Sequence, residues 1–231
     1  MWQNHIKVHY IHVPDPLLRD PNPEPLLIQN SSTVIQYFKA FCENKPSAAF
    51  AYFYFDFNDP EKQNPRNFLS SLISQLCIQV PHFPEEVEGL YKRCDNGNRK
   101  ATVPELKEVL KHLAVVKDLD DIFIIADALD ECPHDEVHGL QKEALDLIVE
   151  FKTWSASKIH LLITSRRELD IEQRLTPLLG IPPIPLEGSQ IDSDIELHIS
   201  EQLSTDQKLK RWPPQVKLQI EETLTAQADG M

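Results

Sequence analysis

Two short apolar runs constrain the fold of this 231-residue chain more than any other feature. The run IFII covers residues 122–125 and the run HLLI covers residues 160–163, and neither alternates with charged side chains. Strands of this kind are buried on both faces, as happens when helices cover both sides of a parallel sheet. Helical patterns lie before, between and after the two runs. The sequence therefore predicts an α/β fold with a mostly parallel sheet and helices on both faces.

Most of the chain after residue 30 has a helix or strand pattern. Helices are expected from Ser31, from Pro65 after a cap at Asn64, from a capping box formed by Thr102 and Glu105, and over about 137–153, 193–204 and 214–227. Strands are expected over 48–57, 122–126 and 158–167, with weaker candidates in 6–13 and 180–188.

Composition divides the chain into three parts. Residues 1–30 hold five prolines between positions 14 and 25, which predicts an irregular Pro-rich segment. Residues 31–190 contain the alternating strands and helices of a single core. Residues 191–231 are expected to begin a C-terminal helical region that stops early.

Charge and cysteine usage exclude some functions. The formal net charge is −13, which disfavours binding to a phosphate backbone or an anionic membrane surface. No apolar run is long enough to span a bilayer, and the N-terminus lacks the apolar core of a signal peptide. The four cysteines are scattered without a CxxC pair, which favours a reducing, cytoplasmic location.

Polar residues follow both apolar runs. Asp127 ends the first, with Asp130 and Glu131 close behind. A carboxylate at the end of a parallel strand can hold Mg²⁺ beside nucleotide phosphates, and a second one can orient the attacking water. The alternative is a strand that ends in a solvated acidic turn.

The second run ends in Thr164, Ser165 and Arg166. The hydroxyls can bind a phosphate or its water, and the guanidinium can contact the terminal phosphate. The alternative is that Arg166 and Arg167 begin a loop and pair with nearby acids.

Five stretches, in this order, carry a family resemblance: SSTVIQYFKAFCENKPSAAFAYFYFDFNDPEKQ, IFIIADALDEC, KIHLLITSRRELDIEQRL, DIELHISEQL and EETLTAQADGM. They resemble the NACHT-type branch of the STAND P-loop NTPases, in the form found in fungal NLR-like proteins and related to the nephrocystin-like N-terminal NTPase domain. The resemblance implies a three-layer P-loop NTPase-like fold in which the HLLITS strand lies beside the Walker B strand. It also implies a cytoplasmic signalling switch that binds Mg-ATP or Mg-GTP.

The resemblance assigns roles to individual residues. Asp127 would be the Walker B residue that binds the metal, and Asp130 and Glu131 would be the catalytic acidic pair. Thr164 and Ser165 would contact the nucleotide beside Arg166, the sensor arginine.

The phosphate-binding loop of that family is missing. The family enters its first helix through GxxxxGK[ST], whereas residues 22–30 read NPEPLLIQN, with neither glycine nor lysine. Glycines let backbone N–H groups converge on phosphate, and the lysine supplies charge. We therefore expect weak nucleotide binding or none, no NTPase activity, and a sheet that is incomplete at its first strand, where KVHYIHV or PLLIQ could substitute.

Three functions remain open. The first is a degenerate nucleotide-dependent switch. The second is a non-enzymatic interaction module, an adaptor or decoy that binds itself or related NACHT proteins. The third is a poorly folding truncation with exposed sheet edges.

Two histidine-containing segments could suggest a metal. Cys132, His134, Glu136 and His138 have spacing that could suit Zn²⁺, and His5, His9 and His12 lie near the N-terminus. A polar loop in the first case and an irregular terminus in the second are the favoured interpretations.

Overall fold

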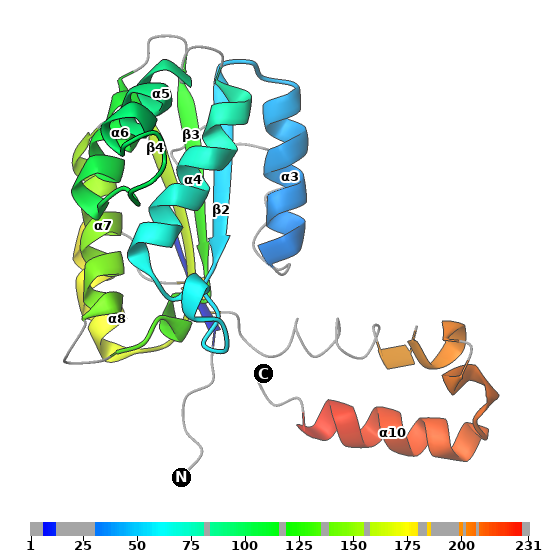
Figure 1. Cartoon of the computed structure of the whole chain (residues 1–231). Coiled ribbons are helices and arrows are strands. Elements are labelled where there is room, and N and C mark those ends of the chain that lie inside the picture. The colour runs from blue at the N-terminus through cyan, green and yellow to red at the C-terminus, as the bar shows by residue number, and fades with distance from the viewer. Residues whose placement is uncertain are drawn as a thin grey trace.

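The fold is of the α/β class: helices surround one sheet that contains both parallel and antiparallel strands (Figure 1). The computed structural model describes residues 7–12, 31–80, 84–115, 119–134, 139–154, 158–179, 184–185, 199–200, 202–206 and 208–227. The sheet order is β2-β3-β4-β1-β5. The strands are β1 (Lys7–His12), β2 (Ala48–Tyr54), β3 (Asp121–Asp127), β4 (Ile159–Arg166) and β5 (Ile184–Pro185).

The two continuous apolar runs form neighbouring parallel strands. β2, β3 and β4 are mutually parallel, with Ile125 opposite Leu162 and Ala126 opposite Ile163. This confirms the predicted parallel strands and the placement of the HLLITS strand beside the IFIIAD strand. β1 and β5 differ, because β1 pairs antiparallel with β4 and β5 pairs antiparallel with β1. The weak strand signal near the N-terminus is therefore a real strand that runs opposite to β4.

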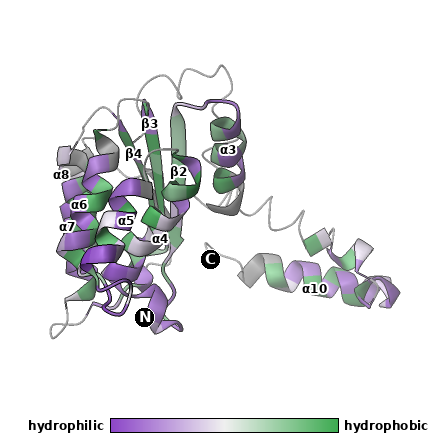
Figure 2. Ribbon diagram, turned by 45° about the horizontal axis from the view of Figure 1, so that its top comes forward, coloured by the Kyte–Doolittle hydropathy of each residue, from purple (hydrophilic) through white to green (hydrophobic). Residues whose placement is uncertain are grey.

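Helices cover both faces of the parallel strands. Alternate residues of β3 face opposite sides, so Ile122 and Ile124 belong to one apolar cluster while Phe123 and Ile125 belong to another. The first cluster includes residues of α4 (Pro65–Gln79), α5 (Pro84–Arg93), α6 (Val103–Ala114), α7 (Leu140–Trp154) and α8 (Leu169–Leu179). The second lies under α3 (Ser31–Glu43), where the Phe38 and Phe123 ring centroids are 4.5 Å apart. Figure 2 shows hydrophobic residues along the strands between these two layers.

Helix starts follow the predicted capping residues. The Asn64 side chain accepts a hydrogen bond from the Arg66 N–H (2.9 Å), with Pro65 in the first turn of α4. Thr102 and Glu105 form the capping box of α6, since the Thr102 N–H donates to the Glu105 carboxylate (2.8 Å). The hydrogen bond from Arg99, added to those from Thr102, holds the pKa of Glu105 well below its ordinary value.

Some boundaries differ from the prediction. β2 ends at Tyr54, not at residue 57, because its partner β3 ends at Asp127 and Asp56 turns the chain by accepting a hydrogen bond from the Asn58 N–H. Helix α5 has no counterpart among the predicted elements. The helix predicted over 137–153 begins at Leu140, and residues 137–138 lie outside the described residues.

The opposite end of β3 is fixed by an ionic network. The Asp121 carboxylate accepts from Lys45 Nζ (2.5 Å) and lies 2.6 Å from Nε2 of the buried His160. Partial burial alone raises the pKa of Asp121, but the hydrogen bonds from Lys45 and His160 outweigh it, so the pKa lies below its ordinary value. The network joins the start of β3 to β4 and to the turn after α3.

The exposed backbone edge of β2 is covered by two side chains of α4. Gln79 donates from Nε2 to the Phe50 carbonyl (2.7 Å) and accepts from the Phe50 N–H (3.0 Å). Gln75 makes the same pair of bonds with Tyr52, at 2.7 and 3.1 Å. The amides thus take the place of a neighbouring strand at this edge of the sheet.

The C-terminal part contains η3 (Leu209–Arg211) and α10 (Pro214–Gln227), and residues 199–200 and 202–205 are also helical. The helix predicted over 214–227 is confirmed, but Val216, Leu218 and Leu224 remain exposed. Figures 1 and 2 both draw α10 apart from the helices around the sheet. Within the described part of the chain, no helix combines the length and apolar character that spanning a membrane requires.

Candidate functional site at the strand tips

The carboxyl ends of β3 and β4 bring Asp127 and Thr164 together. The Thr164 hydroxyl donates a hydrogen bond to Asp127 Oδ1 and accepts one from the Ala128 N–H (3.0 Å). Asp127 is 9% exposed and Thr164 is fully buried. Both positions continue the alternation that places Phe123 and Ile125 on the α3 side of the sheet. The predicted pair is therefore adjacent, but its polar atoms are already bonded to one another.

A tight turn after β3 brings Asp130 to the tip of β4. Ala128 has a left-handed backbone (φ 54°), and a single turn of 3-10 helix, η2 (Leu129–Glu131), follows it. Asp130 then accepts from the Arg166 N–H (2.8 Å) and pairs with Arg166 Nε (3.1 Å). The Asp130 side chain is only 5% exposed whereas the Arg166 side chain is 43% exposed, so the carboxylate of this ion pair is removed from water and the arginine is not.

The remaining predicted residues have other partners. Glu131 Oε2 accepts from the Phe57 N–H (3.2 Å), which joins the turn to the loop after β2. The buried Ser165 donates from its hydroxyl to the Arg166 carbonyl (2.7 Å). Arg167 pairs with Glu172 (3.1 Å) on α8. The acids and arginines thus pair with one another, as the alternative interpretation of the sequence expected.

A pocket of about 420 Å³ opens at the carboxyl ends of β3 and β4, and we call it the strand-tip pocket. Its lining residues are Phe57, Gln63, Asp130, Glu131, Pro133, Arg166 and Glu168. Asp127, Thr164 and Ser165 do not line it. The predicted site is therefore divided between three buried residues and three that reach the pocket.

Sequence reasoning missed Phe57, Gln63, Pro133 and Glu168 as lining residues. Glu168 lies two residues after Arg166, so its position could have been found from the strand end. Phe57 and Gln63 come from the loop between β2 and α4, where the Gln63 amide donates to the Phe57 carbonyl (2.6 Å). No motif in that loop indicates that it reaches the β3 turn.

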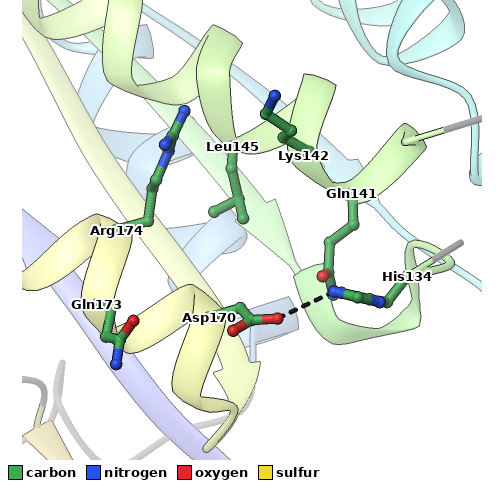
Figure 3. A pocket seen from close by; sticks show the side chains of 7 residues that line it. All are labelled: His134, Gln141, Lys142, Leu145, Asp170, Gln173 and Arg174. Atoms are coloured by element: carbon green, nitrogen blue, oxygen red, sulfur yellow. Dashed lines mark ion pairs between the residues drawn. The ribbon is translucent and has the colours of Figure 1, made fainter. Parts of the chain in front are cut away.

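Cys132 and His134, the two candidate zinc residues that the structure describes, have separate partners. Cys132 is buried and its thiol donates to the Gln63 carbonyl (3.3 Å), and burial raises its pKa to about 12. His134 instead pairs with Asp170 (2.9 Å) beside a second pocket between α7 and α8 (Figure 3). Glu136, His138 and His5 lie outside the described residues. Among the residues that are described, no group of three or more histidine, cysteine or acidic side chains is placed to bind a metal.

The direction of β1 determines at which end of the parallel strands β1 begins and at which end it finishes. Lys7 pairs with Arg166 and His12 pairs with Leu161, so β1 begins at the strand-tip edge and ends deeper in the sheet. A loop that follows β1 therefore starts away from Asp127. Residues 22–30, where the family resemblance places the phosphate loop, lie outside the described residues.

Comparison with known proteins adds a family to this geometry. The family model described as nephrocystin 3, N-terminal, matches residues 30–166, which is more than half of the chain and includes both strand tips. The chain belongs to the nephrocystin 3 N-terminal family. The match begins next to α3 and ends at Arg166, so every predicted site residue lies inside the family region.

One curated relative is similar over most of the chain. Dynamin-binding protein of Canis lupus familiaris is 24% identical over 170 residues, which is 73% of this chain and 10% of that protein. The chain thus spans about a tenth of that relative's length. No solved structure matches this chain.

Proposed function

We propose that this chain is a NACHT-like domain of the STAND P-loop type that acts as a non-enzymatic protein-interaction module. In this proposal the domain keeps the architecture of a nucleotide-dependent switch but does not bind the phosphates of a nucleotide. Asp127 holds the Walker B position, Asp130 and Glu131 are the acidic pair, and Arg166 holds the sensor position. The order of these residues along two neighbouring parallel strands supports the assignment.

The observation that carries the proposal is the charge of the strand-tip pocket. Its described lining residues include three carboxylates, Asp130, Glu131 and Glu168, against the single guanidinium of Arg166. That guanidinium is already paired with Asp130. A nucleotide triphosphate entering the pocket would meet net negative charge, and charge repulsion in a partly desolvated site opposes binding.

The described residues do not fit a magnesium nucleotide. The Asp127 carboxylate accepts the Thr164 hydroxyl, is buried, and does not line the pocket. The backbone N–H at the β4 tip, that of Arg166, is taken by Asp130. We therefore derive no catalytic step through a bound nucleotide.

A role in protein assembly has independent support. The curated relative is named for binding a protein, dynamin, and this supports a protein partner for the related chain. Pairing along β2 is disfavoured because Gln75 and Gln79 occupy its backbone edge. The partner surface is therefore sought elsewhere, at the strand tips or on the helices. We place this activity in the cytoplasm, which the four free cysteines support.

Titration with fluorescent ATP and GTP analogues in Mg²⁺ tests the proposal. We expect no saturable binding tighter than about 1 mM, because phosphate contacts supply most of the affinity in this class of site. The Asp127→Ala variant serves as the control. Micromolar binding that is lost in this variant would show that the site works without a glycine-lysine loop.

A nucleotide-dependent switch is the second candidate. It is favoured by the convergence of Asp127, Thr164, Asp130 and Arg166 at the carboxyl ends of β3 and β4. The same titration separates the two, since a switch requires binding and an interaction module does not.

A further inference from the structure

Exposed apolar side chains occur in the lining of the strand-tip pocket and next to it in the sequence. Phe57, which lines the pocket, is 63% exposed. Leu169, which directly follows the lining residue Glu168, is 68% exposed. Large apolar residues this exposed beside a pocket are typical of a surface that receives a partner.

Two carboxylates in the pocket keep hydrogen-bonding capacity. Glu131 uses Oε2 for the Phe57 N–H, and Glu168 uses Oε2 for the Gln141 side chain (3.1 Å). Their other oxygens accept no hydrogen bond from the described residues. A guanidinium or ammonium group would complement these oxygens, and a guanidinium could also stack on the exposed Phe57 ring.

The chain itself carries a segment of matching chemistry. Residues 208–217, KLKRWPPQVK, contain four basic residues and no acid, although the chain as a whole has a net charge of −13. Lys208, Lys210 and Arg211 are exposed and form no ion pair with the described residues. Trp212, beside Arg211, is 44% exposed. We call residues 208–217 the basic segment.

We propose that the strand-tip pocket of one copy of this chain receives the basic segment of a second copy. Arg211 or Lys210 enters between Glu131 and Glu168, and Trp212 packs against the exposed Phe57. The inference rests on the proposed function, because a nucleotide in the pocket would compete with the basic segment. Each copy has one pocket and one segment, so the contact is head-to-tail and can extend beyond a dimer.

Sedimentation of the full 231-residue chain over a range of concentrations tests the inference. We expect the mass to rise above the monomer at low salt and to return to it at about 0.5 M salt, where exposed charges are screened. Glu131→Gln with Glu168→Gln should abolish association. The matched control, Glu85→Gln with Glu108→Gln, removes two exposed acids from α5 and α6 and should leave it unchanged.

A mixing experiment identifies the two surfaces. Chains with Glu131→Gln and Glu168→Gln keep a native segment, and chains with Lys210→Gln and Arg211→Gln keep a native pocket. Each should be monomeric alone, and an equimolar mixture should form a heterodimer through the one native pocket and the one native segment. Circular dichroism and urea unfolding verify that every variant is folded, so that loss of association is not loss of structure.

Several results would overturn the inference. They are a monomeric wild-type chain at every concentration, variants that associate as the wild type does, or a mixture that stays monomeric. A wild-type monomer that becomes more compact at low salt would mean that the segment binds within its own chain. None of these results affects the proposed function, which fails on nucleotide binding alone.

Discussion

At the scale of single residues, the candidate site is a set of polar groups that satisfy one another. Thr164 accepts from Ala128 and donates to Asp127, so one hydroxyl holds both the strand end and the buried carboxylate. Asp130 in turn binds both the backbone and the side chain of Arg166. Buried polar groups are costly unless they are paired, so these contacts stabilise the turn at the strand tips.

We expect Thr164→Val to lower the free energy of unfolding by about 2 to 4 kcal/mol, since the buried Asp127 carboxylate and the Ala128 N–H would lose a partner. Valine keeps the shape of threonine, so little of this loss would come from packing. Thr164→Ser, which keeps the hydroxyl, is the control and should cost about 1 kcal/mol for the missing methyl group. Urea unfolding measures both, and equal stabilities of the two variants would contradict the role given to the hydroxyl.

At the scale of elements, the sequence predicts the strands and helices that have strong local patterns. The apolar runs at 122–125 and 160–163 became β3 and β4, and the caps at Asn64 and Thr102 start α4 and α6. Helix α5 was missed although Pro84 opens it, acids fill its first turn and Lys92 and Arg93 its last. Its apolar content is low, so it lacks the apolar periodicity that marks the other helices in the sequence.

The protection of the β2 edge could not be predicted, because it depends on tertiary contact between α4 and the strand. We expect Gln75→Ala with Gln79→Ala to lower the free energy of unfolding by about 1 to 3 kcal/mol, as the four hydrogen bonds to Phe50 and Tyr52 are lost. The freed edge should also promote strand pairing between chains, seen as light scattering that increases with concentration. The exposed pair Gln36→Ala with Gln219→Ala is the control. Scattering equal to that of the control would mean that α4 covers the edge without these amides.

At the scale of the whole molecule, the direction of β1 decides at which end of the parallel strands the following segment starts. Nothing in the residues of β1 predicts whether it runs parallel or antiparallel to β4, because direction is decided by the connections on either side. The antiparallel pairing starts β1 at the strand tips, so β1 ends away from the strand ends that hold Asp127 and Arg166. The sequence placed Asp127 and Arg166 at the ends of two strands and offered pairing of the arginines with nearby acids as an alternative, but the particular pairs, such as Arg166 with Asp130, became visible only in the fold.

At this scale, the sheet and the C-terminal helices are separate parts of the molecule. α10 leaves Val216, Leu218 and Leu224 exposed, and it packs closely against none of the described elements around the sheet. Lys217 donates to the carbonyls of Leu203 and Lys210, which joins α10 to the preceding residues of the C-terminal part. We therefore expect a chain ending at residue 198 to keep the unfolding free energy of the sheet within about 0.5 kcal/mol, as changes remote from a core do. Urea unfolding followed by far-UV circular dichroism measures this, with the full chain as reference. A drop of several kcal/mol would mean that the C-terminal helices are part of the folding unit, and they could then not serve as a segment that a second copy receives.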